Sequence, residues 1–160
     1  MSELNFTHLD DKGSARMVDV TEKVPTVRSA SAVARINCQP TTLQALADGK
    51  VPKGDVFAVA RVAGIAAAKK TPELLPLAHV IGVHGATVDI SICEDHVQIQ
   101  TTVRTADRTG VEMEALTSAT VAALTIVDMV KGVDRSVEIT DCKIVAKSGG
   151  RSGNWTRPAK

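Results

Sequence analysis

Aromatic side chains are scarce in this sequence, making up 2% of its 160 residues, and tyrosine is absent. Proteins that bind single-stranded nucleic acid stack bases on such side chains, so no stacking platform is available here. The sequence also lacks an excess of charge of one sign, because it contains 19 Lys and Arg residues and 18 Asp and Glu residues. A phosphate backbone selects for a basic surface. We therefore expect no nucleic-acid partner, and a core of Val, Ala, Leu and Ile.

Cysteine is also rare, and Cys38, Cys93 and Cys142 form an odd set without a CxxC pair. This pattern favours reduced thiols in a cytosolic protein over a disulfide framework or a zinc site. No uncharged apolar run reaches the roughly 18 residues of a membrane span, and no N-terminal signal pattern is present. We expect a cytoplasmic protein with no membrane partner and no metal site built by the protein.

The length fits one domain, and a hydrophobic fraction of 44% is enough for a substantial core. The polar start of the chain predicts a partly mobile segment over residues 1–24, which could still close over a ligand. A single domain is expected over residues 25–153, followed by a C-terminal tail over residues 154–160.

Hydrophobic periodicity places strands and helices along the chain. Apolar residues at every second position predict strands, with a hairpin between the second and third. Helices are predicted where apolar residues recur at the longer helical period, and Pro72 is expected to end the helix over residues 56–70. The expected strands are residues 31–38, 83–93, 96–105, 136–139 and 143–146, and the expected helices residues 43–47, 56–70 and 110–131. This order predicts an α+β fold, a ferredoxin-like βαββαβ sandwich with helices on one face of an antiparallel sheet.

The predicted long helix, residues 110–131, carries ionisable side chains at both ends. Asp128 and Lys131 are three residues apart and share a face, so they form either a plain helical ion pair or part of a functional site. At the other end, Thr109 and Glu112 fit a capping box, and Glu114 suits the positive end of the helix dipole. The two ends are about 21 Å apart along the helix. If both serve one small ligand, they must come from different subunits, which predicts an oligomer with interfacial sites.

Other segments offer candidate anion sites. Lys53-Gly54-Asp55 precedes a helix, where free N–H groups and a lysine can meet phosphate, although Asp55 can equally be a simple cap. The loop over residues 147–153 combines three glycines with Lys147 and Arg151, which suits phosphate binding as well as a flexible tail. No Walker pattern is present. His79, in an apolar linker, is as well explained by a backbone hydrogen bond as by catalysis.

Taken in order, eight motifs cover residues 17–153 and resemble the family of cyclic pyranopterin monophosphate synthases, the C proteins of molybdenum cofactor biosynthesis. The motifs are Met17-Val-Asp-Val20, Lys53-Gly-Asp-Val56, Ala60-Arg-Val-Ala-Gly-Ile65, Leu75-Pro-Leu-Ala-His79, Thr109-Gly-Val-Glu-Met-Glu-Ala-Leu116, Val121-Ala-Ala-Leu-Thr-Ile126, Asp128-Met-Val-Lys131 and Lys147-Ser-Gly-Gly-Arg-Ser-Gly153. The resemblance implies a lyase with a ferredoxin-like fold, assembled as a hexamer, a trimer of dimers with sites between subunits. It also implies the substrate 3′,8-cyclo-7,8-dihydroguanosine 5′-triphosphate and the products cyclic pyranopterin monophosphate and diphosphate.

Family roles carry over where residues match, within an expected catalytic domain of residues 25–153. Lys53, Asp128 and Lys131 resemble the catalytic trio. The resemblance and the loop chemistry together give the expected substrate-binding residues Leu77, Ala78, His79, Glu112, Met113, Glu114, Lys147 and Arg151. No cofactor is evident, although Mg²⁺ could accompany the triphosphate.

The sequence departs from the family pattern beside these residues. Ala78-His79-Val80 stands where the family usually has Cys-His-Pro, and Val127 and Val130 replace Tyr and Cys. Two alternatives therefore stay open: a non-enzymatic module of the same fold that binds nucleotides or regulates a partner, and a structural paralogue with reduced or no activity.

Overall fold

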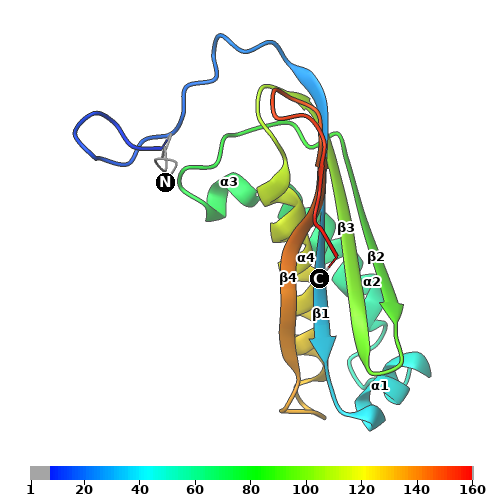
Figure 1. Cartoon of the computed structure of the whole chain (residues 1–160). Helices are drawn as coiled ribbons and strands as arrows, with labels where there is room; N and C mark the ends of the chain where they lie inside the picture. Colours follow the sequence, from blue (N-terminus) through cyan, green and yellow to red (C-terminus); the bar gives the residue numbers. More distant parts are fainter. Residues whose placement is uncertain (1–7, 160) are drawn as a thin grey trace.

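The computed structural model describes residues 8–159. Its centre is a five-stranded antiparallel sheet in the order β2-β3-β1-β4-β5. The helices lie on one face of this sheet, and the opposite face is open (Figure 1). The elements are β1 (Thr26–Asn37), α1 (Pro40–Ala47), α2 (Val56–Lys69), α3 (Thr71–Leu74), β2 (Gly85–Ile92), β3 (His96–Asp107), α4 (Glu112–Val130), β4 (Glu138–Ser148) and β5 (Trp155–Thr156).

The period-two pattern explains which face of the sheet receives the helices. In β1, the alternate residues Ala30, Ala32, Ala34 and Ile36 are buried, and residues between them are more exposed. β3, the antiparallel neighbour of β1, buries Val97, Ile99, Thr101 and Val103 in the same way. Successive side chains of a strand point to opposite faces, so both central strands present one apolar face to α4.

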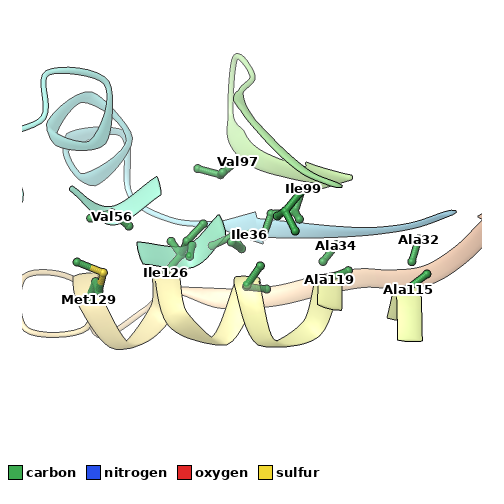
Figure 2. Packing of buried hydrophobic residues seen from close by; sticks show 14 of the residues in the cluster. Ala32, Ala34, Ile36, Val56, Val97, Ile99, Ala115, Ala119, Ile126 and Met129 are labelled. Atoms are coloured by element: carbon green, nitrogen blue, oxygen red, sulfur yellow. The ribbon is translucent and has the colours of Figure 1, made fainter. Parts of the chain in front are cut away.

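Small residues let α4 pack closely on the sheet and on α2. Figure 2 shows Ala32 beside Ala115 and Ala34 beside Ala119, while larger side chains such as Ile36 and Ile126 fill the other end of the interface. At Gly64 of α2, a Cβ atom would lie 3.0 Å from the backbone oxygen of Ser118 in α4. The absence of a side chain at Gly64 therefore allows the close spacing of the two helices.

The α+β, ferredoxin-like fold is confirmed, with differences in detail. β1 starts at Thr26 rather than residue 31. Residues 71–74, where Pro72 was expected only to end the preceding helix, form the short helix α3, because Pro72 suits the first turn of a helix. The two short strands expected over residues 136–146 are one strand, β4, whose pairing with β1 is interrupted by register shifts. The glycine-rich end of the chain adds β5, since Trp155 and Thr156 pair with β4.

The expected capping box at the start of α4 is wrong. Val111 occupies the N-cap position, and no side chain caps this end by a hydrogen bond. Glu112 instead forms an ion pair with Lys147 of β4, in which Glu112 Oε1 lies 3.2 Å from Lys147 Nζ. At the start of α2 the predicted cap is confirmed, because Asp55 Oδ1 accepts a hydrogen bond of 2.9 Å from the Ala58 N–H.

One helix in the described part of the chain, α4, is long and apolar enough to cross a membrane by length and composition alone. Half of its apolar stretch is buried inside the protein, where it packs on β1 and β3. A core helix passes the same test, so this feature is weak evidence for a membrane span. Of the predicted mobile segment, residues 1–7 lie outside the described residues.

Candidate functional site

The predicted site residues gather at the two ends of α4. In Figure 1, the first turn of α4 lies near α3 and the chain leading into β1, and its last turn lies near α1. We call the cavity at the first turn the helix-start pocket. We call the trio of Lys53, Asp128 and Lys131 at the last turn the helix-end cluster.

The helix-start pocket is a cavity of about 410 Å³. Six residues predicted to bind substrate line it: Leu77, Ala78, His79, Glu112, Met113 and Glu114. They come from the loop after α3 and from the first turn of α4, which are brought together by the packing of α3 against α4. The structure therefore unites two motifs that are more than thirty positions apart in the sequence.

Glu114 is the buried acid of this pocket, with 3% of its surface exposed. Burial removes water from its carboxylate and raises the pKa of Glu114 above its ordinary value, and the nearby charge of Glu112 acts in the same direction. The backbone N–H of Glu114 and the nearby His79 oppose this shift but do not outweigh it. Glu114 thus holds a proton more readily than an exposed glutamate, and it can serve as donor or acceptor to a ligand.

His79 is fixed by the backbone of the N-terminal segment. Its Nε2 lies 2.6 Å from the carbonyl oxygen of Val18. A carbonyl can only accept a hydrogen bond, so Nε2 carries the hydrogen, and in the neutral ring Nδ1 is left as an acceptor. Both sequence interpretations of His79 are therefore partly right, because it bonds to backbone and also lines the pocket.

Lys147 connects the helix-start pocket to the glycine-rich loop. Its Nζ lies 3.2 Å from Glu112 Oε1 and donates a hydrogen bond of 2.7 Å to Ser152 Oγ. Arg151 lines a second, adjoining cavity of about 690 Å³, and Lys23 lines both this cavity and the helix-start pocket. Lys147 thus reaches a pocket residue directly, whereas Arg151 faces the adjoining cavity.

The helix-end cluster forms within one chain. Lys53 Nζ donates to the backbone oxygen of Asp128 at 2.8 Å and lies 3.5 Å from its Oδ2, while Lys131 Nζ lies 2.7 Å from Oδ1. The hydrogen bond and charge of Lys131, followed by the charge of Lys53, lower the pKa of Asp128 below its ordinary value. The negative end of the α4 dipole also favours both ammonium groups here. The ion pair predicted from sequence spacing is confirmed, and Lys53 joins it from the loop before α2.

The cluster is open to solvent in the single chain. The side chains of Lys53, Asp128 and Lys131 are 49%, 58% and 60% exposed. Asp128 and Lys131 border a shallow hollow with Leu124, Thr125 and Val127, and none of these residues lines the helix-start pocket. One chain therefore carries two separate groups of candidate site residues at opposite ends of a helix, about 21 Å apart.

Comparisons with known proteins identify the family of this chain. The model of the MoaC family matches residues 17–150, a stretch that includes the helix-end cluster and the lining residues of the helix-start pocket other than His8. The chain belongs to the MoaC family.

Curated relatives extend the match. A cyclic pyranopterin monophosphate synthase of Streptomyces coelicolor is 54% identical over 152 residues, covering 95% of this chain and 89% of the relative. The protein of the same name from Geobacter sulfurreducens is 53% identical, covering 96% of this chain and 98% of the relative. The protein of the same name from Chloroflexus aurantiacus is 52% identical, covering 99% of this chain and 99% of the relative. The MoaC resemblance read from the eight motifs is therefore confirmed.

The structure separates the departures from the family pattern by location. Ala78 lines the helix-start pocket, whereas Val80 is 89% exposed and does not. Val130 is fully buried, so the replacement at this position affects the packing of the core. Val127 borders the hollow beside Asp128. Ala78 is thus the departure that alters the pocket wall.

Several pocket residues escaped sequence reasoning, namely His8, Val18, Val20, Lys23, Thr109 and Gly110. Val18 and Val20 belong to a motif that carried the MoaC resemblance and to the segment over residues 1–24 that was expected to be able to close over a ligand, and Thr109 and Gly110 belong to another such motif. The signal was therefore present, but no binding role had been assigned to these residues individually. Among residues 8–159, no three His, Cys, Asp or Glu side chains are grouped as metal ligands would be.

Proposed function

We propose that this chain is a lyase of molybdenum cofactor biosynthesis, a cyclic pyranopterin monophosphate synthase. It converts 3′,8-cyclo-7,8-dihydroguanosine 5′-triphosphate to cyclic pyranopterin monophosphate and diphosphate. The observation that carries the proposal is the identity of more than half of the positions to proteins of that name over nearly the whole chain. We interpret the helix-start pocket and the helix-end cluster as two half-sites, which supply ionisable groups that this chemistry needs.

The helix-start pocket suits the guanine-derived ring. Glu112 and Glu114 can accept hydrogen bonds from the N–H edge of such a ring, and the neutral Nδ1 of His79 is a further acceptor. Burial makes the charged form of Glu114 costly, so a ligand N–H that bonds to it gains more than it would in water. Leu77 and Met113 add apolar wall for the ring faces.

The helix-end cluster handles protons. Rearranging a purine-derived ring into a pterin requires proton transfers and ring opening, for which an acid–lysine set is suited. Asp128 is held as a carboxylate between two ammonium groups, and these can donate protons or stabilise developing negative charge. In the single chain the cluster is exposed to solvent, so its chemistry depends on a surface that covers the cluster and excludes water.

A second copy of the chain supplies that cover. Between the two half-sites, the outer face of the helix layer exposes Val59 and Val62 of α2 and Leu124 of α4. Large apolar side chains exposed on packed helices can belong to a protein interface, and we place the contact with the second copy here. If a neighbour packs on this face, its helix-start pocket can meet the helix-end cluster of the first chain. The assembly expected from the MoaC resemblance, a hexamer built as a trimer of dimers, fits this need.

The triphosphate lies where the cations gather. Lys147 reaches Glu112, and Arg151 lines the adjoining cavity together with Lys23 and Arg28. Cations placed there neutralise the charge of the departing diphosphate when the cyclic phosphate closes. Mg²⁺ bound by the triphosphate itself can add to this neutralisation.

The second candidate function is a paralogue that binds nucleotides but turns over slowly or not at all. Ala78 favours it, because this residue lines the pocket where the family usually carries a thiol. Complementation of a strain that lacks cyclic pyranopterin monophosphate synthase separates the two candidates, since a binding protein without turnover cannot restore the cofactor.

Asp128→Asn in the purified protein tests the acid–base assignment. We expect kcat to fall by about 100-fold or more, because a positioned proton-transfer group contributes that much or more. Asp89→Asn, on an exposed position of β2, is the matched control and should keep the parent rate. An Asp128→Asn enzyme that turned over at the parent rate would remove the helix-end cluster from the mechanism.

Subunit mixing tests the shared site. Chains carrying Lys131→Ala are mixed with chains carrying Glu112→Gln, and the mixed oligomers should regain about a quarter of the parent activity, because a quarter of the shared sites then combine two intact halves. A mixture of Lys53→Ala and Asp128→Asn is the negative control, since both residues lie in one half-site. Equal behaviour of the two mixtures would exclude sites shared between chains.

A further inference from the structure

The chain that leads into β1 forms a strap across the helix-start pocket, which we define as residues 8–24. Its outer part is a small hairpin, in which Leu9 pairs with Ala15 and the His8 carbonyl accepts a hydrogen bond of 2.8 Å from the Arg16 N–H. Asp10 Oδ1 tightens the turn of this hairpin by accepting from two backbone N–H groups. In Figure 1, the strap arches from the start of β1 toward α3.

Side chains of the folded body hold the strap by its backbone. His79 Nε2 donates to the Val18 carbonyl at 2.6 Å, and Arg108 Nε donates to the Lys23 carbonyl at 2.9 Å. Within residues 8–159, these are the side-chain hydrogen bonds that tie the strap to the rest of the chain. The two strap residues held in this way, Val18 and Lys23, both line the helix-start pocket.

The strap therefore supplies one wall of the pocket. His8, Val18, Val20 and Lys23 come from the strap, and the other lining residues come from the loop after α3, the connection between β3 and α4, and the first turn of α4. We infer that Arg108 is a positioning residue, which fixes this wall, and that His8 is a substrate-contacting residue that the strap delivers. The inference rests on the proposed function for the identity of the ligand, a purine-derived nucleotide, but not for the docking of the strap.

Arg108 is well placed for this role because its own backbone is anchored. Its N–H donates to Asp107 Oδ1 at 2.7 Å, and its carbonyl accepts from Arg28 Nη2 at 3.2 Å. The side chain thus starts from a fixed point at the end of β3 and reaches the strap with a charge-assisted hydrogen bond. Such a bond holds the strap whatever side chain stands at position 23, because the acceptor is a main-chain carbonyl.

Limited trypsin digestion of the full chain tests strap docking without substrate. Lys12, Arg16 and Lys23 are cleavage sites within the strap, and a docked strap protects them. Arg108→Ala should speed cleavage at these sites by about ten-fold, the loss expected for one charge-assisted hydrogen bond. Arg108→Lys keeps a charged donor and should restore most of the protection. Arg104→Ala, an exposed position on β3, is the matched control and should digest like the parent.

Turnover kinetics test the consequence for substrate. Arg108→Ala and His8→Ala should each raise KM for the cyclic nucleotide by about ten-fold and leave kcat within about two-fold, since neither residue acts in the chemical step. His8→Ala should leave strap cleavage unchanged, because the hydrogen bond of His8 to Arg16 is made by its backbone. Unchanged strap cleavage in Arg108→Ala, or an unchanged KM in both variants, overturns the inference. A chain that forms no product refutes the proposed function, and the digestion still decides whether the strap docks.

Discussion

Acid stability should depend on one buried carboxylate, Asp134, which follows α4. Asp134 is 4% exposed, and its Oδ2 accepts hydrogen bonds from the Gln39 N–H at 2.8 Å and the Thr42 hydroxyl at 3.1 Å. Its Oδ1 accepts from the N–H and hydroxyl of Ser136 at 2.8 and 2.6 Å. These bonds, led by that from Gln39, lower the pKa of Asp134 from 3.8 to about 2. The carboxylate thereby ties the start of α1 to the chain that leaves the helix-end cluster.

The magnitude follows from this shift in pKa. One pKa unit corresponds to about 1.4 kcal/mol, so ionised Asp134 contributes roughly 2 kcal/mol to the free energy of unfolding. Because the folded-state pKa is depressed, this contribution is complete above the ordinary pKa of 3.8 and is lost as the pH falls toward 2. Asp134→Asn should cost about 2 kcal/mol at pH 7 and remove this part of the acid dependence.

Urea unfolding followed by circular dichroism at pH 7, 4 and 2.5 measures the effect, at one protein concentration so that association does not differ between samples. The exposed Asp89 of β2 provides the matched control, and Asp89→Asn should follow the parent at each pH. If Asp134→Asn lost as much stability as the parent between pH 4 and 2.5, the hydrogen bonds of Asp134 would not be the cause of the acid dependence.

Further predictions concern the pocket, the core and the interface. Glu114→Gln should raise the free energy of unfolding at pH 7, because a carboxyl with a raised pKa destabilises the folded protein as the pH rises through that pKa. The same variant should bind substrate more weakly. Urea unfolding measures the first effect, and KM measures the second. Gly64→Val should destabilise by about 1–3 kcal/mol in thermal unfolding, because its side chain would press on the Ser118 carbonyl, whereas the exposed Val80→Ala should change little. Leu124→Glu should shift the protein to a smaller species in sedimentation, and an unchanged mass would exclude this face as an interface.

Family membership and fold could be read from the sequence because both rest on local patterns. The alternation in β1 and β3 is encoded within each strand, and the βαββαβ order restricts the sheet to a few topologies, of which the ferredoxin-like one is observed. The pairing of Asp128 with Lys131 followed from their spacing on one helix. The boundaries were less accurate where tertiary contacts extend an element, as in β5, whose two residues form a strand only because β4 lies beside them.

The tertiary structure decided which residues gather at each end of α4. Lys53 meets the Asp128 carbonyl across 75 positions, and His79 meets that of Val18 across 61. The capping box failed for the same reason, because Lys147 of β4 attracts Glu112 away from its own helix end. Periodicity fixes which face of an element is apolar, but sheet register and helix packing fix which distant side chains meet. The sequence by itself thus determined the family, the fold and the ionisable residues, and the tertiary structure decided that these residues gather in two groups at opposite ends of α4.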